Sequence, residues 1–170
     1  MDALKAAVIL FVAAILQLSV LTEYQPFRTG SVVLVALLAV ALLRGSVFGA
    51  VAGFLTGLML DTATLGTLGV TSLLLTVAGF WIGRYGETTA RDRFHAPYVS
   101  VAVVTVLYVV GELLLQFMLG EPAPAALAMH GLPGALLLNL VLTLPVYAVI
   151  RRLFPPLELG DRVREVRLLG

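Results

Sequence analysis

Six polar side chains interrupt long apolar stretches of the sequence and are the first candidates for binding or catalysis. The set contains carboxylates, amides and one hydroxyl, so it can donate and accept hydrogen bonds. A carboxylate can also act as a general acid or base where a neighbouring group tunes its protonation. The sequence pairs neither carboxylate of the set with a base, so we predict binding rather than catalysis. The six residues are Gln17, Asp61, Thr67, Glu112, Gln116 and Asn139.

Other residue types that carry chemistry are scarce. The chain has no cysteine, which removes thiolate nucleophiles, disulfides and cysteine metal sites. We expect His95 and His130 in loops on opposite faces of the protein, where they cannot form one metal or catalytic site. Neither a G-x-S-x-G nor an H-E-x-x-H motif occurs. We therefore expect no enzyme activity, no metal, no cofactor and no nucleic-acid partner.

The composition indicates the environment in which the polar set lies. Apolar residues make up 60% of the chain, charged residues only 12%, and the mean hydropathy is +1.03. A soluble domain is nearer half apolar and a quarter charged. We therefore predict an all-α integral membrane protein that forms one compact bundle in the lipid bilayer.

Six apolar stretches approach the roughly 20 residues that a spanning helix needs. The second and third are short and meet at Arg44 and Gly45, which suit a tight turn; a single broken or re-entrant element is the alternative. The first stretch is too long for a signal-peptide core and lacks a convincing cleavage site. The predicted spans are residues 3–21, 27–43, 45–61, 65–83, 97–119 and 132–150.

The basic residues predict the orientation of the bundle, because Lys and Arg gather in cytoplasmic loops. With both termini in the cytoplasm, Arg28 is the one basic residue left on the outer side. The asymmetry also favours an even number of spans. The inner side then holds Lys5, Arg44, Arg84, Arg91, Arg93, Arg151, Arg152, Arg162, Arg164 and Arg167.

The polar set falls in the outer halves of the predicted spans, whereas the inner halves are almost entirely apolar. Ionisable groups at membrane depth are costly and usually face a cavity or a partner. We therefore predict a bundle that is closed inside and has a polar pocket open to the periplasmic side; structural hydrogen bonds between helices are the alternative. Asp61 is expected to cap the outer end of the third span, and Thr67 to begin the fourth. Glu112 is expected to be protonated, wetted from outside, or hydrogen-bonded to Asn139 or Gln17.

Glycines are spaced by four residues along the third span, and a shorter patch lies on the fourth. Small residues let helix backbones approach each other in lipid, where close packing drives association. We predict that this groove packs against another helix of the bundle, crossing in the right-handed sense; a groove for another protein's helix is the alternative. These glycines are Gly45, Gly49, Gly53, Gly57, Gly79 and Gly83.

The chain divides into a six-helix bundle over residues 1–154 and a basic cytoplasmic tail over residues 155–170. In the tail, Val163, Val166 and Leu169 recur every three residues between arginines. That spacing predicts a short basic helix on the inner leaflet, with a frayed, solvated tail as the alternative.

Two stretches resemble a known family. Residues 42–85, "LLRGSVFGAVAGFLTGLMLDTATLGTLGVTSLLLTVAGFWIGRY", contain an Arg-Gly turn, a glycine-rich helix ending in GL-x-x-D, then LG, and a helix ending in GRY. Residues 138–154 read "LNLVLTLPVYAVIRRLF". They resemble the middle and the last span of MreD, the rod-shape-determining membrane protein family. Family members often begin the second span with Pro-Asp; this chain has "PFRTGSVVLV" there, so a role for that acid is not carried over.

The resemblance implies a non-enzymatic scaffold of the Rod complex, which supports peptidoglycan synthesis in cell-wall elongation at the bacterial inner membrane. The direct partner would be MreC. RodA, its class B penicillin-binding protein and the filament MreB would be indirect partners. We predict that MreC binds the outward-facing pocket through the six residues of the polar set.

The MreD fold is similar to the substrate-binding subunits of energy-coupling-factor vitamin transporters, which supplies a second hypothesis. An Ala-x-x-x-Ala pattern on the first span favours it, and Ala3 and Ala7 fit that spacing. However, the predicted pocket lacks the aromatic and polar groups that a vitamin usually needs, and Trp81 is expected on the cytoplasmic side. A lipid-handling protein is a third possibility, because a half-open apolar bundle can admit an acyl chain.

Overall fold

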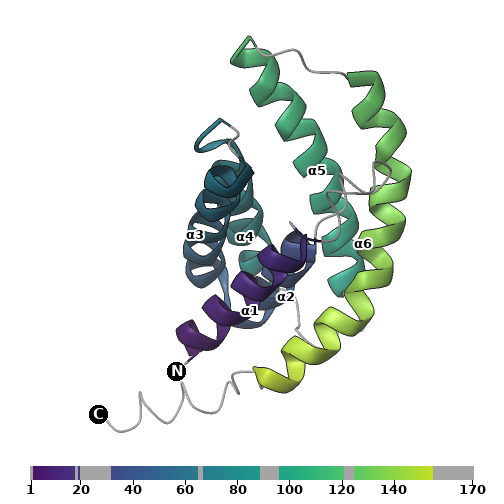
Figure 1. Ribbon diagram of the computed structural model, residues 1–170. Helices are drawn as coiled ribbons and strands as arrows, with labels where there is room; N and C mark the ends of the chain where they lie inside the picture. Colours follow the sequence, from purple (N-terminus) through teal and green to yellow (C-terminus); the bar gives the residue numbers. More distant parts are fainter. Residues whose placement is uncertain are drawn as a thin grey trace, which may run out of the picture.

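The computed structural model describes residues 2–17, 19, 32–64, 67–88, 96–120 and 125–154, which form an all-α fold (Figure 1). The prediction of an all-α protein is therefore confirmed. The expected tail at 155–170 and the loop that holds Arg28 lie outside these residues. The helices are α1 (Asp2–Leu16), α2 (Val32–Arg44), α3 (Ser46–Thr64), α4 (Val70–Thr88), α5 (Ala96–Met118) and α6 (Ala125–Leu153).

Helix α2 lies at the centre of the bundle and contacts each of the other five helices. Every residue from Val33 to Leu43 is buried. This stretch is apolar all round, and a helix of that kind buries its whole circumference. The other helices instead leave one apolar face exposed, for example Val8 on α1 and Leu107 on α5, as expected of helices that meet lipid.

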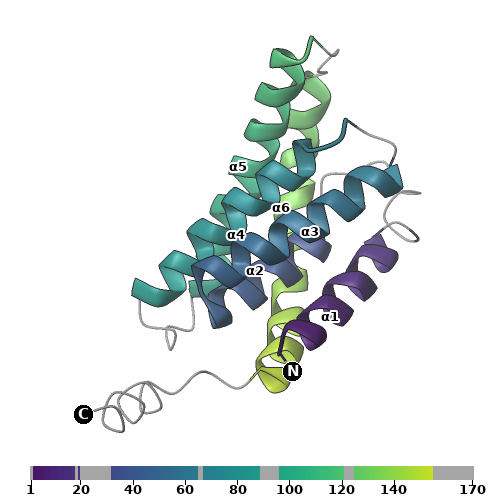
Figure 2. The ribbon, with the colours of Figure 1, turned by 90° about the vertical axis from the view of Figure 1, so that its left-hand side faces the viewer.

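The break predicted between the second and third spans is confirmed, because α2 ends at Arg44 and α3 begins at Ser46. Gly45 between them has a φ of 98°, a left-handed conformation that glycine adopts without steric cost. Helices α3 and α4 then lie side by side, and α1 runs along the other side of α3 (Figure 2).

Several predicted boundaries are wrong. Helix α3 continues to Thr64, beyond Asp61, and α4 occupies Val70–Thr88 instead of residues 65–83. The shift of α4 follows from Gly69, whose φ of 99° ends the preceding turn directly before the helix.

The sixth helix is also longer than residues 132–150, because it runs from Ala125 to Leu153 with Pro133 and Pro145 inside it. Prolines are tolerated within helices of membrane proteins, where neighbouring groups satisfy the freed carbonyls. As a result His130, expected in a loop, lies on α6, where it is exposed.

Among the described residues, three helical stretches are long and apolar enough to cross a membrane: Ser46–Thr64, Pro97–Met118 and Met129–Leu153. The apolar stretches Ala3–Leu16 and Val32–Arg44 are shorter. Six spans and two cytoplasmic termini therefore stay predictions. At the end of the bundle predicted to face the cytoplasm, the Arg44 guanidinium lies 4.8 Å from the centre of the buried Phe154 ring, and this cation–π contact joins α2 to α6.

Candidate functional site

Asp61 caps the start of α4 rather than the end of its own helix. Its carboxylate accepts hydrogen bonds from the backbone N–H groups of Gly69 (2.8 Å), Thr71 (3.2 Å) and Ser72 (3.2 Å). The residue is only 2% exposed, so these bonds replace the water it has lost. The expectation that Asp61 caps the outer end of the third span is wrong, because α3 extends a further turn to Thr64.

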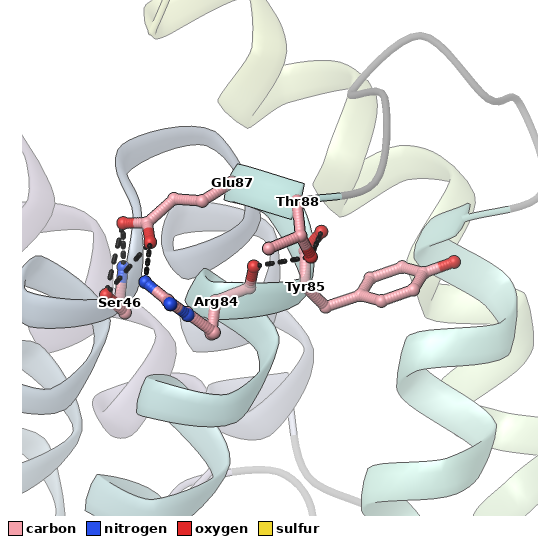
Figure 3. Close-up of polar contacts among 5 residues, drawn as sticks. All are labelled: Ser46, Arg84, Tyr85, Glu87 and Thr88. Carbon is pink, nitrogen blue, oxygen red and sulfur yellow. Dashed lines mark hydrogen bonds and ion pairs between the residues drawn. The ribbon is translucent and has the colours of Figure 1, made fainter.

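A matching cap lies at the opposite end of the same helix pair (Figure 3). Ser46 begins α3, and both its backbone N–H (2.8 Å) and its hydroxyl (3.1 Å) donate to Glu87 Oε1 near the end of α4. Arg84 approaches the other carboxylate oxygen at 3.6 Å. Sequence reasoning missed Glu87. The signal was Gly45, since a glycine before a helix has no side chain with which to cap it.

Gln17 caps the start of the central helix, α2. Its side-chain oxygen accepts a hydrogen bond from the backbone N–H of Val33, one residue into α2, at 3.1 Å. The first four N–H groups of a helix lack partners within it, and lipid supplies none. Three helices of this bundle thus receive an acceptor from a neighbouring helix, and two of the six predicted binding residues serve as caps.

Asn139 joins α5 to α6. It is fully buried, and its side-chain amide donates to the Thr105 hydroxyl at 2.9 Å. Thr143, one turn along α6, donates to the Asn139 backbone carbonyl at 2.6 Å. This arrangement corresponds to the alternative considered for the polar set, a structural hydrogen bond between helices.

A polar cluster remains near the start of α4, which packs against both α3 and α5, and we define the cluster as Asp61, Thr71, Tyr108, Glu112 and Gln116. Tyr108 lies one turn before Glu112 on α5 and near Thr71 at the start of α4. Gln116 donates to Glu112 Oε1 at 3.4 Å along α5. Glu112 and Gln116 are half-buried, so part of each side chain stays accessible. The cluster can therefore exchange hydrogen bonds with a group that approaches α5.

The structure brings together only some of the predicted binding residues. Asp61, Glu112 and Gln116 belong to the polar cluster, whereas Gln17 and Asn139 make the bonds described above to other helices. Thr67 is exposed in the turn before α4. Tyr108 was missed, although it precedes Glu112 and Gln116 at intervals of four residues, which place all three on one face of a helix.

A hollow of about 300 Å³ lies elsewhere, between α1 and α3. Its lining is almost entirely apolar and includes none of the six predicted binding residues. We call it the α1–α3 groove. The polar cluster is thus a patch on the α4–α5 side of the bundle, and the hollow lies on the side of α1.

The predicted glycines lie along the α3–α4 contact. A Cβ atom added to Gly49 would collide with the Gly79 carbonyl, and one added to Gly53 with the Leu75 carbonyl. Side chains at Gly57 and Gly83 would strike the backbones of Ser72 and Gly45. Gly86 was not predicted, yet it meets the Leu42 carbonyl of α2 in the same way. The helix backbones of α3 and α4 therefore touch, and we call this contact the glycine seam.

Comparison with known proteins identifies the family. A family model described as rod shape-determining protein MreD matches residues 3–155 of this chain. Comparison with curated proteins and with solved structures gave no match. The matched range includes the glycine seam, the polar cluster and all six helices apart from Asp2 at the start of α1. Since it extends over most of the 170 residues, the chain belongs to the MreD family of rod shape-determining proteins.

Proposed function

We propose that this protein is a non-enzymatic membrane scaffold of the cell-wall elongation complex and that MreC docks on its polar cluster. A role in rod shape determination follows from the family. The observation that supports a docking role is the gathering of Tyr108, Glu112 and Gln116 on one face of α5, beside the start of α4. Polar groups on a membrane helix are costly unless a partner or water satisfies them.

The proposed topology has six spans and cytoplasmic termini in the bacterial inner membrane. The proposed topology rests on the distribution of basic residues, because it places ten of the eleven lysines and arginines on the cytoplasmic side. In this topology the polar cluster is in the outer half of the bilayer, within reach of a periplasmic partner. RodA, its penicillin-binding protein and MreB would connect to this chain through MreC.

The half-buried part of the cluster, Glu112 and Gln116, is the part of the site to test. A docked MreC segment would exchange hydrogen bonds with both side chains, whereas Asp61 is already occupied by the α4 backbone. A protein segment also suits the site, because it brings its own donors for Glu112 and an apolar surface for the neighbouring face of α5.

We expect Glu112→Leu combined with Gln116→Leu to weaken MreC binding about thirtyfold, because two hydrogen bonds of about 1 kcal/mol each are lost. The measurement is co-purification of MreC with the tagged protein in mild detergent. Leu114→Ala is the matched control, since Leu114 lies between the two residues and is exposed. Size-exclusion profiles check that both variants fold. Undiminished MreC capture by the folded double variant would contradict the docking site.

A further inference from the structure

The α1–α3 groove is lined by small and large apolar side chains of both helices. Ala6, Leu10 and Thr56 are buried in it, Ala52 is half-buried, and Leu55 is exposed beside it. Small side chains such as Ala6 and Ala52 let a third helix approach both backbones, as in helix association within lipid. The groove is therefore shaped like the contact surfaces at which membrane helices pack.

Thr56 differs from the other threonines in the interior of these helices. Thr62, Thr76, Thr105 and Thr143 each donate a hydrogen bond to the carbonyl four residues earlier. Thr56 makes no hydrogen bond to any part of the chain that the structure describes, although it is only 5% exposed. Its side chain lines the groove instead. The hydroxyl oxygen is accessible from the groove, and a hydroxyl that meets hydrocarbon without a partner is unfavourable, so an acceptor brought into the groove would stabilise it.

The depth of Thr56 restricts what can supply that acceptor. Thr56 is about 15 Å along α3 from Ser46, at 1.5 Å per residue. In a hydrocarbon core about 30 Å thick, that position is near the middle of the bilayer. Lipid acyl chains there offer no oxygen, and water is absent. A helix that crosses the membrane carries carbonyl and side-chain oxygens at this depth.

We propose that the α1–α3 groove is the seat of a transmembrane helix of a partner protein. That helix would bring a small residue against Ala52 and an oxygen acceptor to the Thr56 hydroxyl. A second copy of this chain fits less well, because a symmetric contact places the same concave surface on both sides and leaves it unfilled. The inference rests on the proposed membrane topology, but not on MreC docking at the polar cluster, which lies on α4 and α5.

Photo-crosslinking in native membranes tests the groove directly. The chain has no cysteine, so a single introduced cysteine is its only attachment point for a benzophenone maleimide. Ala52→Cys and Leu55→Cys place the probe in the groove. Val77→Cys is the control, because Val77 is an exposed residue of α4, away from α1. The crosslinked residues are then identified by mass spectrometry of peptides.

We expect the groove probes to give at least fivefold more protein adduct than the control. The adducts should map to one face of a single transmembrane segment in one partner. Adding Thr56→Val, which removes the hydroxyl and keeps the shape, should lower the yield severalfold. Adducts to a second copy of this chain, adducts to lipid alone, or equal yields at Val77 would each overturn the proposal. An unchanged yield in the Thr56→Val protein would also overturn it, because the hydroxyl is what selects a helix over lipid.

Discussion

Helix α3 packs against α4 on one side and α1 on the other, and the two contacts differ. Toward α4, glycines bring the two backbones into direct contact along the whole pair. Toward α1, the facing residues are alanines and large apolar side chains, and a hollow of about 300 Å³ remains. One face of α3 is therefore fully packed and the other borders a hollow. The packed face is the one that carries glycines spaced by one helical turn.

The α4 side of α3 is closely packed, whereas the α1 side has room for another group. The glycine seam has no room for another group, and the N-termini of both its helices are capped by carboxylates. The α1 side leaves Thr56 without a hydrogen bond within the described chain, and its surface is apolar. We expect substitutions to harm folding on the α4 side and to harm association on the α1 side.

The largest effect is expected at the glycine seam. Gly53→Leu places a branched side chain against the Leu75 carbonyl and should lower the free energy of unfolding by about 3 kcal/mol, the upper range for overpacking. Thermal unfolding in detergent measures it. Ala52→Leu is the matched control, because the neighbouring residue faces the groove and is only half-buried. Equal stabilities for the two variants would show that the seam is no tighter than the groove.

A smaller loss of stability is expected when the cap of α4 is removed. Asp61→Ala leaves three N–H groups at the helix start, of which that of Ser72 is buried, without their acceptor and should cost about 2 kcal/mol. Glu87→Ala removes the corresponding cap of α3, but Glu87 is more exposed, so water replaces part of what is lost. Chemical unfolding of the two proteins should therefore rank Asp61→Ala as the less stable. The reverse order would mean that burial does not set the strength of these caps.

The smallest effect is expected on α1. Ala7→Leu adds a side chain to an exposed position on the rim of the groove and should change the free energy of unfolding by less than about 0.5 kcal/mol. The same variant should still weaken the crosslink from Leu55→Cys, since the added side chain occupies the space of the docked helix. A large loss of stability would instead show that Ala7 is packed against other residues of the fold, as the buried face of α1 is.

The sequence allowed the helical fold, the Arg44–Gly45 break and the existence of six helices to be predicted, because each depends on local composition. The start of α4 could not be predicted, because it is fixed by Asp61, which is eight residues earlier than its nearest bonding partner, Gly69. The central position of α2 was also missed. Every predicted span of this chain is apolar, so hydropathy alone does not separate a helix that meets lipid from one that meets protein.

The polar set was harder to interpret than the glycines for a related reason. The side-chain oxygen of an amide or carboxylate inside the bundle accepts a hydrogen bond from whichever donor the fold brings near. For Gln17 and Asp61 that donor is a backbone N–H group. Glycine offers only space, so its partner has to be another backbone. Polar residues in apolar helices therefore indicate a hydrogen bond without indicating whether it serves the fold or a partner.

The two caps of the α3–α4 pair have a mechanical consequence. Asp61 holds the start of α4 from one end of the pair, and Glu87 holds the start of α3 from the other. Sliding one helix past the other by a turn, about 5.4 Å, would break both sets of bonds at once, whichever direction it took. The α3–α4 pair is therefore fixed in register and should behave as one rigid unit. Force applied to this protein by a partner should move α1 relative to the α3–α4 pair before it changes the contact between α3 and α4.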